Sequence, residues 1–518
     1  MTQVIDTMSP CGQELNVWLT EEGVPCYCDQ CRGQNTYVLE TRLLATGFHL
    51  VKQQHPDFKL RILLTQGSYP YNDQILAATP PDMGITYYSG THTYDSSHQP
   101  MIYPLLEAYA AGGGWLGAYP QVDNSWRTVF PFTGPQFIRF RMREFVGKKM
   151  ESVTGYATPA NTFWAFNVAA LAEWSWNAEG RDERQFARAW ARRQGIEDVA
   201  GFADWACLIG PLGWDLAGSR FPMRLFWDPA KTILAQPTPM QFGGELLAEI
   251  TSAEHLERNI TLSRQALALA QTLGRPQCVA ESQVVLNSYV FLQALVGVSG
   301  IARDNTAQHA QVRAHLAALD AAAEAAVEGL WDWGCLVYPE TPEKPQHRFE
   351  ETMSVFSQVV TEAYRLAAQA GVADPRPAYR DRVIGGWTEK DFPAAENVFR
   401  FDVTEKLAGA GPYRVMLRYL TGSYGVDIHS VAFLEDNGHG PQPVFRFDPR
   451  LYGYATNPPP PHIGRYEAWN DVRIELPGVR TGARYFVEVK LGGLPLPGEV
   501  AAERRTSSGE ICLRRAWA

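Results

Sequence analysis

The apolar residues of positions 1–240 follow two alternating patterns, one typical of β-strands and the other of α-helices. Short apolar runs predict five strands, at Leu15–Thr20, Leu60–Thr65, Met83–Ser89, Gly114–Val122 and Ser152–Thr158. Between them, apolar residues recur every three or four positions and predict helices at Thr36–Gln54, Met101–Ala111, Gln136–Lys149 and Asn161–Trp176. Repeated strand–helix units predict a parallel sheet, open or closed into a barrel.

The number of strands bears on whether this sheet closes. A complete (β/α) barrel has eight strands, and this pattern contains five. We therefore predict that residues 1–240 form a barrel-like (β/α) domain that holds the fourth to eighth strands of a barrel without the first three. An open doubly wound sheet is the competing description. It would carry a glycine-rich turn that opens a helix, whereas Gly112-Gly113-Gly114 comes before a strand.

The rest of the chain changes its pattern twice. Residues 241–376 are rich in Ala, Leu, Gln and Glu and predict an α-helical bundle, with helices at Leu256–Leu273, Glu281–Val298, His309–Trp331 and Glu350–Ala370. Residues 377–518 contain short alternating runs separated by Gly, Pro, Asn and Asp, and predict an antiparallel β-sandwich. Its expected strands are Arg414–Tyr419, Asp427–Leu434, Val472–Leu476, Arg484–Leu491 and Glu510–Arg515.

Composition narrows the classes of partner. A net charge of -10 with no run of Lys and Arg argues against nucleic-acid binding, and no apolar run reaches the ~18 residues that span a bilayer. Met1–Gly12 lacks the pattern of a signal peptide, and the scattered cysteines suit a reducing compartment, so we expect a cytoplasmic protein. The aromatic share of 12% fits stacking on sugar rings, although large cores also use aromatic residues.

Carboxylates at the ends of predicted strands are the candidates for catalysis, because (β/α) barrels place catalytic groups there. Glu21 and Glu22 end the first strand. Successive strand residues point to opposite faces, so we expect one of them to enter a pocket, and we favour Glu21 as a general acid with Glu22 in the loop. Asp123 is the expected partner, with Asp73 in reserve. A solvated turn is the alternative interpretation for each acid.

Aromatic residues crowd the same strand ends and predict one wall of a sugar site. The residues expected to contact carbohydrate are Tyr69, Tyr88, Trp115, Tyr119 and Trp126. Packing in the core is the alternative for some of them, but loops at strand ends are usually solvated.

Four of the eight cysteines lie close together near the start of the chain. Cys26, Cys28 and Cys31 form a Cys-x-Cys-x-x-Cys motif, and Cys11 would complete a tetrahedral set of thiolates. A structural zinc ion would then hold the loop beside the expected general acid. A metal-free group of thiols and a disulfide are the other interpretations that this spacing allows.

The strand Val17-Trp18-Leu19-Thr20-Glu21, followed by the cysteine motif, resembles a group of large proteins whose barrel domain has no known function and is similar to glycoside hydrolases. Relatives of that group include β-N-acetylhexosaminidases and α-glucuronidases. Residues 161–177 and 186–190 resemble the last barrel helix and the helix after it in those families. The resemblance covers about Glu14 to Arg193, and it implies a barrel that acts on carbohydrate.

Two features depart from those families. Hexosaminidases carry Asp-Glu at the end of the fourth strand, whereas Thr20 precedes Glu21 here, so their substrate-assisted mechanism is not implied. Their amino-terminal domain and early barrel strands have no counterpart in this sequence.

The sequence therefore predicts a glycoside hydrolase that cleaves a glycan or oligosaccharide by carboxylate general acid and base catalysis, with no cofactor required for catalysis. One alternative is a non-catalytic carbohydrate-binding protein. The other is one piece of an enzyme whose first barrel strands are supplied elsewhere.

Overall fold

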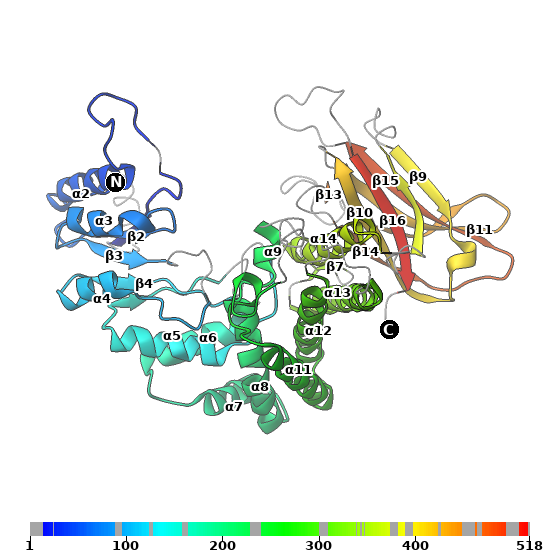
Figure 1. Cartoon of the computed structure of the whole chain (residues 1–518), viewed down its shortest axis with the longest axis horizontal. Coiled ribbons are helices and arrows are strands. Elements are labelled where there is room, and N and C mark those ends of the chain that lie inside the picture. The colour runs from blue at the N-terminus through cyan, green and yellow to red at the C-terminus, as the bar shows by residue number, and fades with distance from the viewer. Residues whose placement is uncertain are drawn as a thin grey trace. The chain divides into compact units, whose positions relative to one another are not determined.

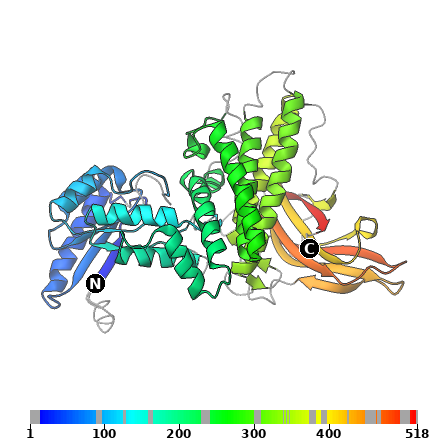
Figure 2. The same cartoon turned by 90° about the horizontal axis from the view of Figure 1, so that it is seen from below.

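A computed structural model describes most of the chain and divides it into two compact units (Figure 1, Figure 2). Unit 1 comprises residues 1–126 and 132–220, and unit 2 comprises residues 127–131 and 221–518. The described residues are 14–23, 25–88, 96–123, 128–157, 164–227, 240–299, 309–337, 339–341, 344–345, 348–372, 382–388, 397–422, 426–447, 462–463, 469–493 and 507–515.

Unit 1 is built around a parallel sheet of five strands, as the apolar runs predict. The strands are β1 (Glu14–Trp18), β2 (Lys59–Leu64), β3 (Gly84–Tyr87), β4 (Leu116–Ala118) and β5 (Ser152–Val153). They lie in the order β1-β2-β3-β4-β5, and every neighbouring pair is parallel. Each strand is shorter than the apolar run that predicts it, because residues beyond the ladder belong to the loops.

Helices connect these strands and continue after the last one. They are α2 (Thr36–Lys52), α3 (Asn72–Ala78, after a 3-10 turn at Tyr69–Tyr71), α4 (Pro104–Ala111), α5 (Pro135–Gly147), α6 (Ala165–Trp176), α7 (Glu183–Arg193) and α8 (Val199–Gly218). The Asn35 side chain begins α2 by accepting the backbone N–H groups of Tyr37 and Val38. Helix α3 was not predicted, because its seven residues are too few to show a helical period.

The two faces of the sheet differ in character. One face carries side chains that are at most 1% exposed: Leu60, Ile62, Ile85, Leu116 and Ala118. Right-handed crossovers put the connecting helices of a sequentially ordered sheet on one face, and this apolar face is the one they bury. The register places Asn16, Arg61 and Gly84 in one row of the opposite face, and Leu63, Thr86 and Gly117 in the next. We call this opposite face the inner face.

Unit 2 begins with helices, four of which the sequence predicts. They are α9 (Met223–Trp227), α11 (Ala253–Leu273), α12 (Pro276–Val298), α13 (His309–Val337) and α14 (Arg348–Gln369). Among the described helices, α12 is the one that is long and apolar enough to cross a membrane. Most of its apolar stretch is buried inside unit 2, where it packs against α11 and α13. Burial in a core therefore accounts for its composition.

Two antiparallel sheets follow in unit 2. One has the order β14-β10-β16-β8, and the other has the order β12-β11-β15-β9, with β13 paired to β11. The strands are β8 (Val383–Trp387), β9 (Asn397–Asp402), β10 (Gly411–Gly422), β11 (Val426–Asp436), β12 (Gln442–Phe447), β13 (His462–Ile463), β14 (Trp469–Leu476), β15 (Arg484–Gly493) and β16 (Ser507–Arg515). Two short strands, β6 (Pro339–Thr341) and β7 (Lys344–Pro345), pair with each other.

Both antiparallel sheets contribute to one hydrophobic core. Tyr413 and Val415 of β10 belong to the same buried cluster as Phe433 of β11 and Tyr485 of β15. The rings of Tyr413 and Phe433 are 5.9 Å apart. The antiparallel prediction for residues 377–518 is therefore confirmed, with four strands that the sequence pattern did not indicate: β8, β9, β12 and β13.

A largely buried carboxylate joins the helices of unit 2 to its sheets. Glu328 of α13 forms an ion pair of 2.8 Å with Arg514 of β16, and the Arg414 guanidinium of β10 lies 5.0 Å from the Trp331 ring. Burial raises the pKa of Glu328 to about 7, although Arg514 and Arg414 act in the opposite direction.

The raised pKa makes the stability of unit 2 depend on pH at this residue. The ordinary pKa is 4.5, so the folded state holds the proton more tightly than the unfolded state. The contribution of Glu328 is then complete below pH 4.5 and is lost as pH rises through about 7. We expect the unfolding free energy of the wild type, minus that of Glu328→Gln, to fall by roughly 2 kcal/mol over this range. Urea unfolding across the pH range measures it, and a constant or rising difference contradicts it.

Candidate functional site

Four aromatic side chains meet at the carboxyl end of the unit 1 sheet. Trp18 ends β1, and Tyr88, Tyr119 and Tyr156 follow β3, β4 and β5. The ring centroids lie 5.9 Å apart for Trp18 and Tyr88, 5.5 Å for Tyr88 and Tyr119, and 5.8 Å for Tyr119 and Tyr156. We call these four residues the aromatic cluster.

The strand register explains why these rings converge. Trp18 pairs with Leu63, which lies in the inner-face row of Thr86 and Gly117. Tyr88 and Tyr119 come two residues after Thr86 and Gly117, so their side chains project from the same face. Gly117 keeps this row low, because a Cβ there would lie 2.6 Å from the Ser152 hydroxyl. The aromatic cluster therefore stands on a row of small side chains.

The four rings differ in how accessible they are. Trp18 is 44% exposed, whereas Tyr88 is 3% exposed and Tyr119 and Tyr156 are half-buried. Burial, together with the nearby Tyr156 phenol, raises the pKa of Tyr119. Tyr119 therefore stays protonated at neutral pH and can donate a hydrogen bond. The cluster offers an open apolar ring and a hydroxyl donor close together.

Asp123 is wholly buried at the same end of the sheet. It follows the bridge between Gln121 and Tyr156, which extends the pairing of β4 and β5. The Asn167 amide of α6 donates to the carbonyl of Val122 at 2.8 Å and to that of Phe132 at 2.7 Å, and so fixes the backbone beside Asp123. The structure thus gives Asp123 a buried position rather than a solvated turn.

Glu21 and Glu22 lie in the loop after β1, and both are exposed. They line a depression of about 610 Å³ together with Pro25, Gln34, Asn35, Thr36, Tyr37, Gly67, Pro70 and Tyr71. The Tyr37 hydroxyl donates to the Glu21 carbonyl at 3.0 Å. Both predicted acids therefore border a solvent-accessible hollow on the side of the sheet where α2 begins.

Glu40 of α2 fixes the backbone that leads into this loop. Its carboxylate accepts the Thr20 hydroxyl at 3.0 Å and the Thr20 backbone N–H at 3.3 Å. Sequence reasoning missed Glu40, since a helical Glu carries no motif. It also listed Trp18 as part of the strand alone, although alternation along the strand could have placed this ring on the inner face.

Two other predicted residues lie apart from the aromatic cluster. Tyr69 packs against Tyr103, with 5.0 Å between ring centroids, and Tyr103 also contacts Tyr87 on the apolar face of the sheet. Asp73 is exposed in the first turn of α3. Because these residues come from the connections between strands, they follow the helices rather than the inner face.

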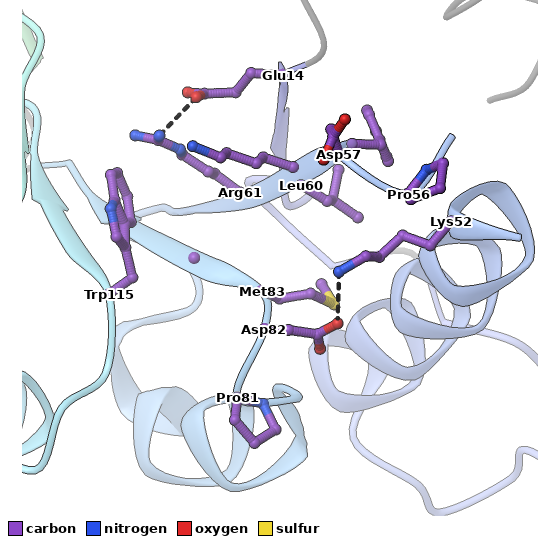
Figure 3. Close-up of a pocket in the computed structure, with 13 residues that line it drawn as sticks. Glu14, Lys52, Pro56, Asp57, Leu60, Arg61, Pro81, Asp82, Met83 and Trp115 are labelled. Atoms are coloured by element: carbon purple, nitrogen blue, oxygen red, sulfur yellow. Dashed lines mark hydrogen bonds and ion pairs between the residues drawn. The ribbon is translucent and has the colours of Figure 1, made fainter. Parts of the chain in front are cut away.

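Trp115 lies at the opposite, amino end of the strands, contrary to the sugar-binding role expected for it. Strand β4 begins at Leu116, so Trp115 precedes the strand. Its ring is covered by the Arg61 guanidinium at 3.4 Å, and Arg61 is paired with Glu14 at 2.6 Å (Figure 3). These residues border a cavity of about 780 Å³ with the Lys52–Asp82 ion pair. This end of a (β/α) sheet serves stability rather than catalysis.

The cysteine motif forms a compact group in the same loop as Glu21. The sulfur atoms of Cys26, Cys28 and Cys31 all lie within 4.8 Å of one another, and those of Cys26 and Cys28 are 3.5 Å apart. Cys11 and Trp126, which the sequence also predicts as site residues, lie outside the described residues.

The approach of Gly67 to the Glu21 loop gives a test of this geometry. A Cβ on Gly67 would overlap the Glu21 carbonyl and lie 2.5 Å from the Tyr37 hydroxyl. We expect Gly67→Ala to lower the unfolding free energy by roughly 1–3 kcal/mol, as overpacking does. Urea unfolding measures the change.

Gly147→Ala is the matched control. No atom lies within 4 Å of a Cβ at Gly147, which ends α5. We expect this variant to be as stable as the wild type or slightly more stable. Equal unfolding curves for the two variants would show that the Glu21 loop does not depend on the contact at Gly67.

No family model matches the sequence, and no curated protein matches it. Two solved structures resemble the chain. An enzyme of glycoside hydrolase family 138 that targets the pectin rhamnogalacturonan II has a TM-score of 0.44 and 10% identity, over 97% of this chain and 68% of that chain. A mutant O-GlcNAc hydrolase of Thermobaculum terrenum has a TM-score of 0.33 and 8% identity, over 72% of this chain and 77% of that chain.

Proposed function

We propose that the carboxyl end of the unit 1 sheet binds carbohydrate and that the chain is a glycoside hydrolase. The observation that carries this proposal is the aromatic cluster, in which residues from four strands converge on one end of the inner face. An open Trp18 ring provides the flat apolar surface that suits the face of a sugar, and the Tyr119 hydroxyl provides a polar contact. Binding sites of (β/α) folds lie at this end of the strands.

We further propose that β1–β5 are consecutive strands of a (β/α) barrel. Their sequential order supports this, because a doubly wound sheet reverses its strand order at a switch point. The inner face also has the composition of a barrel interior, with glycines beneath the Trp115 and Trp18 rings. An apolar outer face under helices and a mixed inner face are what closure into a barrel requires.

In the proposed reaction, two carboxylates act on the glycosidic bond. Glu21 gives a proton to the glycosidic oxygen as its bond to the anomeric carbon breaks. Asp123 attacks that carbon, or removes a proton from the water that attacks it. A fully buried carboxylate beside tyrosines suits the second role, and an acid on an open loop can meet a large glycan.

A non-catalytic carbohydrate-binding protein is the second candidate. The exposure of both Glu21 and Glu22 favours it, because a general acid usually gains its proton-holding character from an apolar pocket. In that case the aromatic cluster would retain a glycan without cleaving it.

Aryl glycosides distinguish these candidates. We expect the chain to release nitrophenol from at least one member of a 4-nitrophenyl glycoside panel, and Glu21→Gln and Asp123→Asn to lower kcat by about 10²–10⁴-fold. Glu197→Gln, an exposed carboxylate before α8, is the control and should keep full activity. An acid variant should also recover rate on an aryl leaving group that needs no protonation. Glycan binding without turnover in the wild type would instead support the second candidate.

The aromatic cluster makes a separate prediction about binding. Trp18→Ala removes an exposed ring, and we expect it to raise the Kd for a glycan selected on an array by about tenfold, near 1.4 kcal/mol. Trp176→Ala is the matched control, since Trp176 of α6 is 92% exposed and lies outside the cluster. Titration calorimetry measures both variants, and equal Kd values for Trp18→Ala and the wild type would remove the cluster from the site.

A further inference from the structure

The loop between β1 and α2 gathers three thiols without the help of a hydrophobic core. The backbone N–H groups of Cys31 and Arg32 donate to the Cys28 carbonyl at 3.2 Å and 3.0 Å, and that of Gln34 donates to the Cys31 carbonyl at 3.0 Å. These turns fold the chain back on itself. Cys26 and Cys28 are exposed and Cys31 is half-buried, so packing does not explain why their sulfur atoms converge.

The distances between the sulfur atoms fit a tetrahedral metal ion. A zinc–sulfur bond of about 2.3 Å sets two thiolate sulfurs roughly 3.8 Å apart at neighbouring corners of a tetrahedron. Here the Cys26 and Cys28 sulfurs are 3.5 Å apart, and all three lie within 4.8 Å of one another. In the described residues this is the group of potential ligands that meets the distance criterion for a metal site.

We propose that Cys26, Cys28 and Cys31 bind one zinc ion as thiolates. Each thiol releases its proton to solvent as its sulfur bonds to the ion, and no sulfur changes its oxidation state. Zinc is the natural occupant because it prefers thiolate ligands in tetrahedral geometry. Three thiolates leave the fourth position to a water molecule or to another donor atom.

Such an ion would shape the depression that holds Glu21 and Glu22. Pro25 precedes the first ligand and Gln34 follows the last, and both residues line that depression. Closing residues 26–31 around a metal removes loop entropy from a segment that otherwise depends on turns alone. The proposal does not depend on hydrolase activity, because metal content is measured without substrate.

Metal analysis of the full chain tests this proposal. The untagged protein, purified under reducing conditions with zinc in the medium, should carry about one zinc ion per chain by mass spectrometry of the elements. Cys28→Ser should reduce this at least fivefold. Cys207→Ser is the matched control and should keep the metal, since burial raises the pKa of that thiol on α8 and no partner thiol lies beside it among the described residues.

Cobalt and thiol titration guard against a folding defect or a disulfide. Cobalt added to the metal-free wild type should produce sulfur-to-cobalt charge-transfer bands that saturate near one equivalent, and circular dichroism should show that Cys28→Ser is folded. Equal zinc in the wild type and Cys28→Ser overturns the proposal. So does a metal-free protein whose three thiols react freely, and so do thiols that react only after reductant is added, which indicate a disulfide.

Discussion

The alternation of side chains across β1–β5 is the constraint on which unit 1 depends. The register sends Leu60, Ile62 and Ile85 to the face under the helices and sends Trp18 and Arg61 to the inner face. A slip of one residue in β1 would exchange Trp18 for Val17 on the inner face and break the aromatic cluster. The same slip would place a large ring among side chains that are packed without space. Folding and binding are therefore set by one choice of register.

The coarse fold could be predicted because period and composition are local signals. Thr36–Lys52 shows a helical stripe in its own sequence, and the four long helices of unit 2 do the same. Strand β8 could not be found this way, since Gly385 and Gly386 interrupt its pattern. Their reason is tertiary: a Cβ on Gly385 would meet the Phe401 ring of β9, and one on Gly386 would meet the backbone of β16. Such contacts are not visible in the residues themselves.

The candidate site was less predictable, because it depends on where each strand ends. Tyr88 and Tyr119 reach the aromatic cluster because β3 and β4 end just before them. Trp115 looked equivalent while the fourth strand was expected to begin at Gly114, yet the ladder begins one residue after Trp115. Asp123 was expected in a solvated turn, and the Asn167 contacts that bury its backbone come from a helix more than forty residues later. Boundaries and distant hydrogen bonds decided these outcomes.

The loop between β1 and α2 is where the chemistry of unit 1 and its mechanics meet. Glu40 and Tyr37 hold its first residues from α2, and Gly67 permits the close approach of the Glu21 carbonyl. These contacts fix the backbone and leave both Glu21 and Glu22 side chains open to solvent. A general acid needs a fixed position as well as a proton, since misplacement by about 1 Å costs on the order of 10²-fold in rate.

The three cysteines lie immediately after these acids and would add the missing restraint on the far side of the loop. With both ends of the loop held, binding of a glycan against Trp18 could exclude water from Glu21 without reordering the backbone. The acid would then reach its working environment only in the complex. In that arrangement the exposed carboxylate and the buried Asp123 are compatible parts of one site, because the ligand itself supplies the low-dielectric wall on the solvent side.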